Sequence, residues 1–68
     1  MKLSDLLKAL AGNENLTVTL IDGDGVKLIS FNASGYENVE SDLQTHEAKK
    51  VQITGTKEVS IVIGDVLP

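Results

Sequence analysis

Apolar residues near the start of the chain recur at the spacing of one face of an α-helix. Four leucines share this i, i+3, i+4, i+7 spacing: Leu3, Leu6, Leu7 and Leu10. The spacing predicts an amphipathic helix over residues 2–11, which Gly12 and Asn13 end in the usual way. We expect its leucine stripe to cover the protein's own sheet, because a hairpin needs such cover; the alternative is a helix that binds a partner.

Two apolar runs rich in β-branched residues follow, over residues 16–21 and 26–31, and Asp22-Gly23-Asp24-Gly25 separates them. This arrangement predicts a β-hairpin. A two-residue turn at Gly23-Asp24 would place polar residues opposite apolar ones. A type I′ turn at Asp24-Gly25 would pair like with like, and we prefer it because register follows the hydrophobic pattern.

The preferred register makes specific pairs and separates the hairpin into two faces. Its pairs are Val18 with Phe31, Thr19 with Ser30, Leu20 with Ile29 and, with opposite charges, Asp22 with Lys27. One face is then apolar, and the other is polar apart from Ile21 and Leu28.

The spacing of apolar residues changes after residue 32. Tyr36, Val39 and Leu43 are three and four residues apart, which predicts a short helix. The alternative is an ordered loop with three anchors, because the neighbouring Asn, Ser and Asp residues also favour turns.

Apolar and polar residues alternate again over residues 49–54 and 59–63, on either side of a turn near Gly55. This alternation predicts a second antiparallel hairpin. Within it we expect two apolar contacts between the strands: Val51 near Ile61, and Ile53 near Val59.

These elements make one domain over residues 1–68 with an α+β fold. We expect an N-terminal helix packed on a four-stranded antiparallel sheet made of two β-hairpins, in the order α-β-β-(short α)-β-β.

The second face of such a sheet stays open, with Ile21, Leu28 and Val62 among polar neighbours. We interpret these three residues as a self-association surface; the alternative is ordinary scattered surface residues. Since so short a chain buries only about 60% of its unfolded surface, a homodimer or higher oligomer would add stability.

Charge and composition exclude several functions. The net charge is −4 and all six basic residues are lysines, so we do not expect direct binding of nucleic acid, which relies on a basic surface and on arginine. The chain has no cysteine, which excludes disulfides and thiolate metal sites. Charges interrupt the start of the chain and no apolar run could span a bilayer, so we expect no signal peptide and no membrane partner.

Two stretches invite metal or catalytic chemistry but lack the residues for it. An EF-hand loop begun at Asp22 would place Val26 at its fifth position and Ala33 where the bidentate glutamate belongs, so we expect no metal. His46, the sole histidine, has a serine and an aspartate nearby in sequence, but nothing indicates the oxyanion hole that a catalytic triad needs, so we interpret it as an exposed loop residue. We therefore expect no enzyme activity and no cofactor.

The excess of acid is localised in the middle of the chain. Four acids have no basic neighbour before Lys49: Glu37, Glu40, Asp42 and Glu47. The remaining six acids balance the six lysines, so these four account for the whole net charge. Tyr36 adjoins them, and a tyrosine beside acids suits a protein-binding surface. The alternative is that Tyr36 packs over the sheet beside Phe31 and that the acids form a solvated face.

Several short stretches together resemble small uncharacterised accessory proteins encoded by phages and prophages of Gram-positive bacteria. The stretches are Lys2-Leu3-Ser4-Asp5-Leu6-Leu7, Thr17-Val18-Thr19-Leu20, Asp24-Gly25, Leu28-Ile29-Ser30-Phe31 and Ala33-Ser34-Gly35-Tyr36. The resemblance covers core and turn positions and brings no catalytic residue. It implies a phage or mobile-element context in the cytoplasm of the bacterial host, where small acidic proteins often bind a host protein or a signalling ligand.

We predict a small acidic interaction protein without catalytic activity, which binds and modulates a host or phage protein through Tyr36 and the acidic residues of segment 37–47. The alternative is a homo-oligomer that sequesters a small anionic ligand such as a signalling nucleotide. One subunit has few cations, so this alternative needs Lys49 and Lys50, or Lys27, to converge across an interface.

Overall fold

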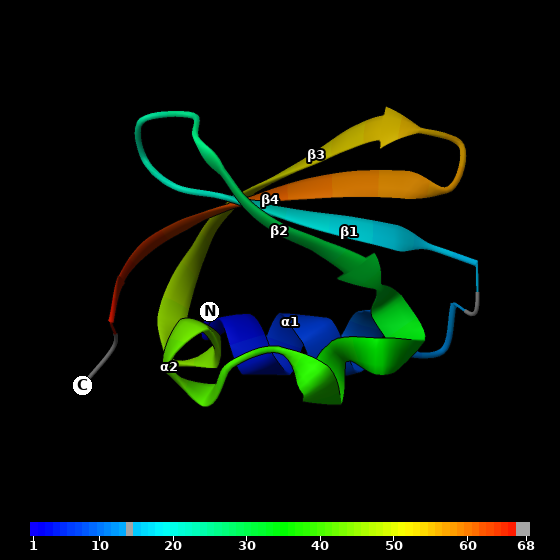
Figure 1. The fold of residues 1–68 in the computed structure, drawn as a ribbon, viewed down its shortest axis with the longest axis horizontal. Coiled ribbons are helices and arrows are strands. Elements are labelled where there is room, and N and C mark those ends of the chain that lie inside the picture. The colour runs from blue at the N-terminus through cyan, green and yellow to red at the C-terminus, as the bar shows by residue number, and fades with distance from the viewer. Residues whose placement is uncertain (14, 67–68) are drawn as a thin grey trace.

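The structure, a computed structural model, describes residues 1–13 and 15–66. A four-stranded sheet forms one layer and the helices form the other (Figure 1). In chain order the elements are α1 (Leu3–Leu10), β1 (Thr17–Ile21), β2 (Lys27–Asn32), the 3₁₀-helix η1 (Ala33–Asn38), α2 (Ser41–Gln44), β3 (His46–Gly55) and β4 (Glu58–Val66). The predicted α+β class is confirmed, with the middle helix divided into η1 and α2.

Helix α1 covers the sheet as its leucine spacing predicts. Leu3 and Leu7 are fully buried, and Leu6 and Leu10 are partly buried against the same core. Asn13 ends the helix, because its backbone N–H and its side-chain amide both donate to the carbonyl of Leu10, at 3.0 and 3.1 Å.

The four strands form one mixed sheet in the order β2-β1-β4-β3, so the expectation of a purely antiparallel sheet is wrong. Each hairpin is antiparallel, as predicted, but the two hairpins join through β1 and β4, which run parallel. Leu20 lies beside Ile61 in this central pair, and both side chains are fully buried. The error has a physical reason: alternation determines the faces of each strand and not which strands of separate hairpins meet.

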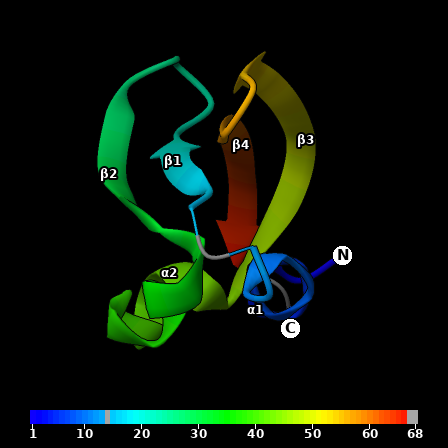
Figure 2. The same ribbon diagram turned by 90° about the vertical axis from the view of Figure 1, so that its right-hand side faces the viewer.

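The centre of the second face is also buried, which suits a parallel pair because parallel strands need protection on both faces. Thr19 and Ser60 lie side by side there, and both are buried. Figure 2 shows β2 and β3 curving on either side of these central strands. The hydroxyl of Thr19 is 2.8 Å from that of Ser30 and shares a hydrogen bond with it, so its burial leaves no polar group unpaired.

The register of the β1–β2 hairpin is confirmed for three pairs: Val18 with Phe31, Thr19 with Ser30, and Leu20 with Ile29. The predicted type I′ turn at Asp24-Gly25 and the predicted pairing of Asp22 with Lys27 are wrong. Ile21 pairs with Lys27 instead. The N–H of Gly25 donates to the carbonyl of Asp22 at 3.1 Å, which moves the turn toward the N-terminus.

The side chain of Asp22 explains this turn. Its Oδ1 accepts from the backbone N–H groups of Asp24 and Val26, each at 2.9 Å. The loop that results has three residues and ends at Gly25, whose φ of 85° is the only positive φ among the described residues. Glycine adopts this left-handed conformation without strain, and at the end of such a loop it forms a bulge itself. A second bulge follows on β2, because the register shifts between Leu20 and Ile21 and leaves Leu28 without a partner in β1.

The register of the β3–β4 hairpin is confirmed, with two predicted pairs present: Val51 with Ile61, and Ile53 with Val59. β3 begins earlier than predicted, and the start of the chain pairs with this early part. The N–H of Ala48 donates to the carbonyl of Met1 at 2.8 Å, and Lys2 lies opposite Glu47.

The segment between the hairpins is held by side-chain bonds to its backbone. The Asn32 side chain accepts from the N–H of Ser34 at 3.0 Å and starts η1. Nε2 of Gln44 donates to the carbonyls of Val39, at 2.9 Å, and Tyr36, at 3.4 Å. These bonds tie α2 to η1, and the buried Val39 anchors both to the core.

The helices cover the sheet unevenly. Figure 2 shows β3 starting beside the helical layer and running away from it. Val51 and Ile53, in the second half of β3, are 48% and 81% exposed, although their partners Ile61 and Val59 are buried. The second half of β3 is therefore apolar surface, where alternation alone predicts core.

Candidate functional site

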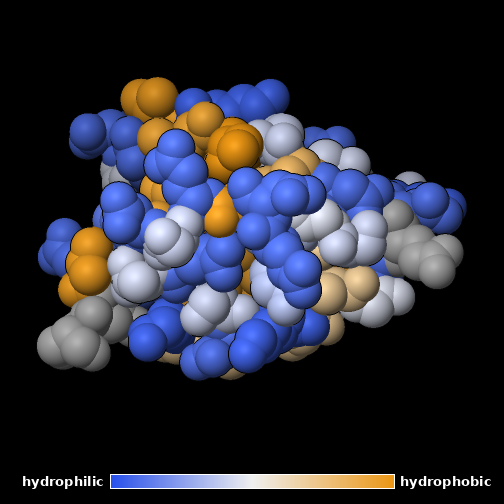
Figure 3. Space-filling view, turned by 60° about the horizontal axis from the view of Figure 1, so that its bottom comes forward, coloured by the Kyte–Doolittle hydropathy of each residue, from blue (hydrophilic) through white to orange (hydrophobic). Residues whose placement is uncertain are grey.

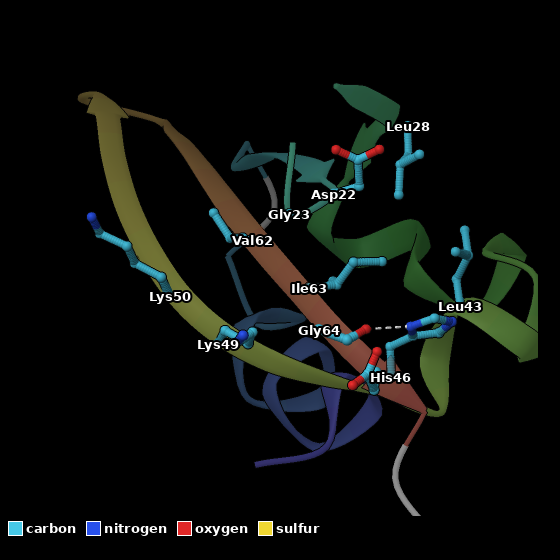
Figure 4. A pocket seen from close by; sticks show the side chains of 11 residues that line it. Asp22, Gly23, Leu28, Leu43, His46, Lys49, Lys50, Val62, Ile63 and Gly64 are labelled. Carbon is cyan, nitrogen blue, oxygen red and sulfur yellow. Dashed lines mark hydrogen bonds between the residues drawn. The ribbon is translucent and has the colours of Figure 1, made fainter. Parts of the chain in front are cut away.

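A cleft of about 650 Å³ opens at the end of the sheet where the β1–β2 turn, the start of β3 and the end of β4 meet (Figure 4). We call it the end cleft. Four apolar side chains from three elements line it: Leu28 of β2, Leu43 of α2, and Val62 and Ile63 of β4. Figure 4 shows Leu28 and Leu43 directed toward each other from opposite sides. A concave site with an apolar lining is the usual form of a binding pocket.

The β1–β2 turn builds one wall of the end cleft. The bonds to the Asp22 carboxylate set the turn, and a separate bulge at Leu28 follows on β2. Bulges re-aim side chains, and here the bulge leaves Leu28 43% exposed at the cleft.

His46 lies on the opposite wall of the end cleft. Its Nδ1 is 2.6 Å from the carbonyl oxygen of Gly64, and because a carbonyl only accepts, Nδ1 carries the proton. This bond joins the start of β3 to the end of β4, where the strand register shifts. A catalytic triad would instead need a carboxylate at this nitrogen. His46 therefore has a structural task in this position.

Lys49 lies across Gly64 at the edge of the cleft. A Cβ atom on Gly64 would be 2.6 Å from Cδ and 2.8 Å from Cγ of Lys49, so a side chain at this position would force the lysine stem to move. Packing of the stem positions the ammonium group beside the cleft. Lys50 also lines the cleft, but Figure 4 shows its side chain directed away from Leu28 and Leu43.

The end cleft carries charges of both signs. Asp22 and Asp65 line it together with Lys49 and Lys50. Positive and negative groups in one small cleft partly cancel, so the lining does not select a simple anion or a simple cation. Its selectivity has to come from the apolar side chains and from the charge around the rim.

The structure brings together the residues that the sequence suggests for self-association. Ile21 lies beside Val62 in the β1–β4 pair, and the bulge places Leu28 next to Ile21. Leu28 and Val62 also line the end cleft. The lysines proposed for an anionic ligand are not brought together: Lys27 is at the start of β2, outside the cleft lining.

The residues proposed for partner binding fall into two environments. Glu37 of η1, Glu40 just before α2 and Asp42 in its first turn are exposed. Figure 3 shows hydrophilic side chains over most of this helical side of the molecule. Glu47 differs, since it is partly buried on β3 opposite Lys2.

Tyr36 is partly buried and packs against the core, as Phe31 does. Its backbone carbonyl accepts from the N–H of Val39 at 3.1 Å, at the C-terminal end of η1. The tyrosine therefore anchors the acidic segment to the rest of the protein.

Sequence reasoning missed four residues of the end cleft: Leu43, Ile63, Gly64 and Asp65. They come from segments that only the topology brings together. One indication was available, because Gly64 interrupts an apolar strand, and a glycine there often marks a bulge or a close approach of another group.

Comparisons with protein-family models, with curated proteins and with solved structures found no match to this chain. Over residues 1–13 and 15–66, every helix is too short or too polar to cross a membrane. The same residues contain no group of three or more His, Asp or Glu side chains that could hold a metal ion. The end cleft and the acidic segment beside it are the features on which a functional proposal can rest.

Proposed function

We propose that this protein is a non-catalytic interaction module that binds a partner protein at the end cleft. The observation that supports the proposal is that Leu28, Leu43 and Val62, from three different elements, line one concave site. An apolar side chain of a partner would enter between them. Binding energy at protein interfaces is concentrated in such buried anchors, and the surrounding contacts mainly exclude water.

The acidic segment, residues 37–47, favours a partner with positive charge. Leu43 lines the cleft, and the exposed carboxylate of Asp42 precedes it on α2. Glu37 and Glu40 add exposed negative charge nearby in the chain. Complementary charge raises the association rate and selects between partners, so we expect the partner segment to be basic around its apolar side chain. Tyr36 holds this segment in place.

The resemblance to phage and prophage proteins adds a prediction about context. In that context the partner is a host or phage protein in the bacterial cytoplasm. The resemblance carries no residue of the binding site, and the end cleft is argued from its geometry alone.

Nuclear magnetic resonance titration of the labelled protein tests the proposal with two peptides of equal length, one with a leucine between lysines and one with a leucine between glutamates. We expect the lysine peptide to shift the amide signals of residues 28, 43 and 62, and the glutamate peptide to bind more weakly. Shifts spread over the surface, or equal binding of both peptides, would contradict the proposal.

A matched pair of variants separates the end cleft from general charge effects. Leu28→Lys places a charge in the cleft, and Val26→Lys adds the same charge outside the cleft lining, at a residue that is 55% exposed. We expect only Leu28→Lys to abolish the shifts of the lysine peptide. Equal loss in both variants would show that charge, and not the cleft, controls binding.

Sequestration of a small anionic ligand is the second candidate function, and one observation favours it. Packing against Gly64 holds Lys49 beside the cleft. Because Lys50 diverges and Lys27 lies elsewhere, further cations would have to come from another subunit. Calorimetry with inorganic phosphate and a panel of nucleotides tests this candidate, and the absence of heat with every anion would exclude it.

A further inference from the structure

We propose that the open edge of β3 pairs with β3 of a second copy of this chain, in an antiparallel arrangement centred on Gln52. β3 is ten residues long and lies at the edge of the sheet. An edge strand presents N–H and C=O groups on its outer side that can pair with another strand. The inference rests on β3, and of the end-cleft lining only Lys49 and Lys50 lie in the stretch that would pair.

Only part of this edge is available. Met1 and Lys2 pair with its beginning, through the 2.8 Å bond from Ala48 to Met1 and the bridge between Lys2 and Glu47. Within the described part of the chain, no element pairs with the outer edge over residues 49–55. The midpoint of this open stretch is Gln52.

The hydrophobic pattern selects the same centre. Antiparallel pairing about Gln52 places Val51 opposite Ile53 of the partner subunit, and the symmetry repeats this contact on the other side. Residues directly opposite in such a pair share one face and touch. Four apolar side chains would therefore form a continuous strip across the junction. In the single chain, Val51 and Ile53 are 48% and 81% exposed.

The charges are compatible with this register. Lys50 would lie opposite Thr54 of the partner subunit, and Lys49 opposite Gly55 of the partner subunit, so no lysine faces a lysine. Pairing centred on Val51 would instead place Lys49 opposite Ile53 of the partner subunit and would bring no Val–Ile contact. The register centred on Gln52 thus satisfies the open length, the apolar pattern and the charges together.

Lysines and bulges on an edge strand commonly prevent pairing with another chain. On β3 these features stand at the ends of the open stretch. The register against β4 shifts between Ala48 and Lys50 and again between Ile53 and Gly55. From Lys50 to Ile53 the strand is regular, and this interval contains both exposed apolar residues. The short contact predicts a reversible dimer that depends on concentration.

A cysteine at the proposed symmetry axis tests the register. The chain contains no cysteine, so a single substitution gives an unambiguous crosslink. In a Gln52→Cys variant the two introduced thiols would be on residues whose Cα atoms are about 4.5–5.5 Å apart, within the range of a disulfide. In a Thr54→Cys control, at an exposed position of the same strand, they would be about 13 Å apart at about 3.3 Å per residue.

We expect mild oxidation to convert the Gln52→Cys protein to a covalent dimer and to leave the Thr54→Cys protein monomeric. Equal crosslinking of both variants, or of neither, would overturn the proposed register.

The molar mass in solution tests the interface itself. We expect sedimentation equilibrium of the full chain to show a mass that rises from monomer to dimer with concentration. Ile53→Lys should remain a monomer, and the control Val26→Lys should behave as the wild type. A wild type that stays monomeric would overturn the proposal. So would a dimer that persists in Ile53→Lys and dissociates in Val62→Lys, because the contact would then be the surface of Ile21, Leu28 and Val62.

Discussion

Val59 and Ile53 lie opposite each other in the β3–β4 hairpin, on one face of one sheet, yet their side chains are 8% and 81% exposed. Alternation of apolar and polar residues assigns both to the inward face. The difference comes from what lies beneath them, since β4 is a central strand while β3 runs away from the helices (Figure 2). Alternation determines which way a side chain points, and the neighbouring layer determines whether that direction is core.

This contrast divides the molecule into two regions with different tasks. The covered region contains α1 and the central strands, and its fully buried residues Leu3, Leu7 and Ile61 hold the fold together. The uncovered region is the second half of β3, where apolar residues add little to the core. We infer that Val51 and Ile53 serve contact with another chain, because apolar edge residues without cover favour association.

The largest expected effect comes from comparing alanine substitutions at the two residues of one cross-strand pair, Ile61 and Val51. Ile61→Ala leaves a cavity in a fully buried site and should lower the free energy of unfolding by about 2–5 kcal/mol. Val51→Ala, on the opposite strand, should cost less than about 1 kcal/mol because its side chain already meets solvent. Urea unfolding at low protein concentration measures both. Similar losses would remove the distinction between covered and uncovered regions.

If Ile61→Ala fails to fold, Ile61→Val gives a smaller step on the same scale, with an expected loss of about 0.5–1.5 kcal/mol. The corresponding control on β3 is again Val51→Ala. A loss for Ile61→Val no larger than that of the control would point to a loosely packed centre.

A backbone effect of intermediate size is expected at the β1–β2 turn, where burial by the helical layer does not contribute. Gly25 has a φ of 85° and free space around its Cα, so Gly25→Ala should cost about 1–3 kcal/mol through conformation alone. Gly23→Ala is the matched control, since Gly23 has equal space and no positive φ. Thermal unfolding of the two variants compares them, and equal midpoints would contradict the turn described above.

A smaller effect is expected at the end cleft, where Lys49 of β3 lies across Gly64 of β4. Gly64→Ala forces the stem of Lys49 to move, with an expected loss of about 1 kcal/mol. Lys49→Ala in the same chain should recover most of that loss, because the added methyl group then has room. A double-mutant cycle measures this coupling, and additive losses would mean that the two residues do not contact each other.

Much of the fold could be predicted from the chain. The leucine spacing predicts α1, and alternation predicts both hairpins with their registers from Val18 to Leu20 and at Val51 and Ile53. Two features could not be predicted in this way. The parallel contact of β1 with β4 depends on how separate hairpins pack. The turn depends on the Asp22 carboxylate, which favours a three-residue loop over the type I′ turn.

The candidate site could be predicted only in part. The sequence pattern predicts Leu28 and Val62 on one surface, and both line the end cleft. The spacing predicts Leu43 in a short helix, and His46 is expected in an exposed loop; the structure places both at the cleft, Leu43 on α2 and His46 partly buried at the early start of β3. The spacing of residues along the chain does not show which distant segments contact each other in the fold.

Ile53→Lys separates folding from association most directly. At low protein concentration, we expect its free energy of unfolding in urea to stay within about 0.5 kcal/mol of the wild type, because the residue is 81% exposed. At high concentration, the wild-type unfolding midpoint should rise as the dimer forms, and that of Ile53→Lys should not. A loss of about 2 kcal/mol or more at low concentration would show that Ile53 belongs to the core. A variant midpoint that rises with concentration as the wild type does would show that β3 is not the contact.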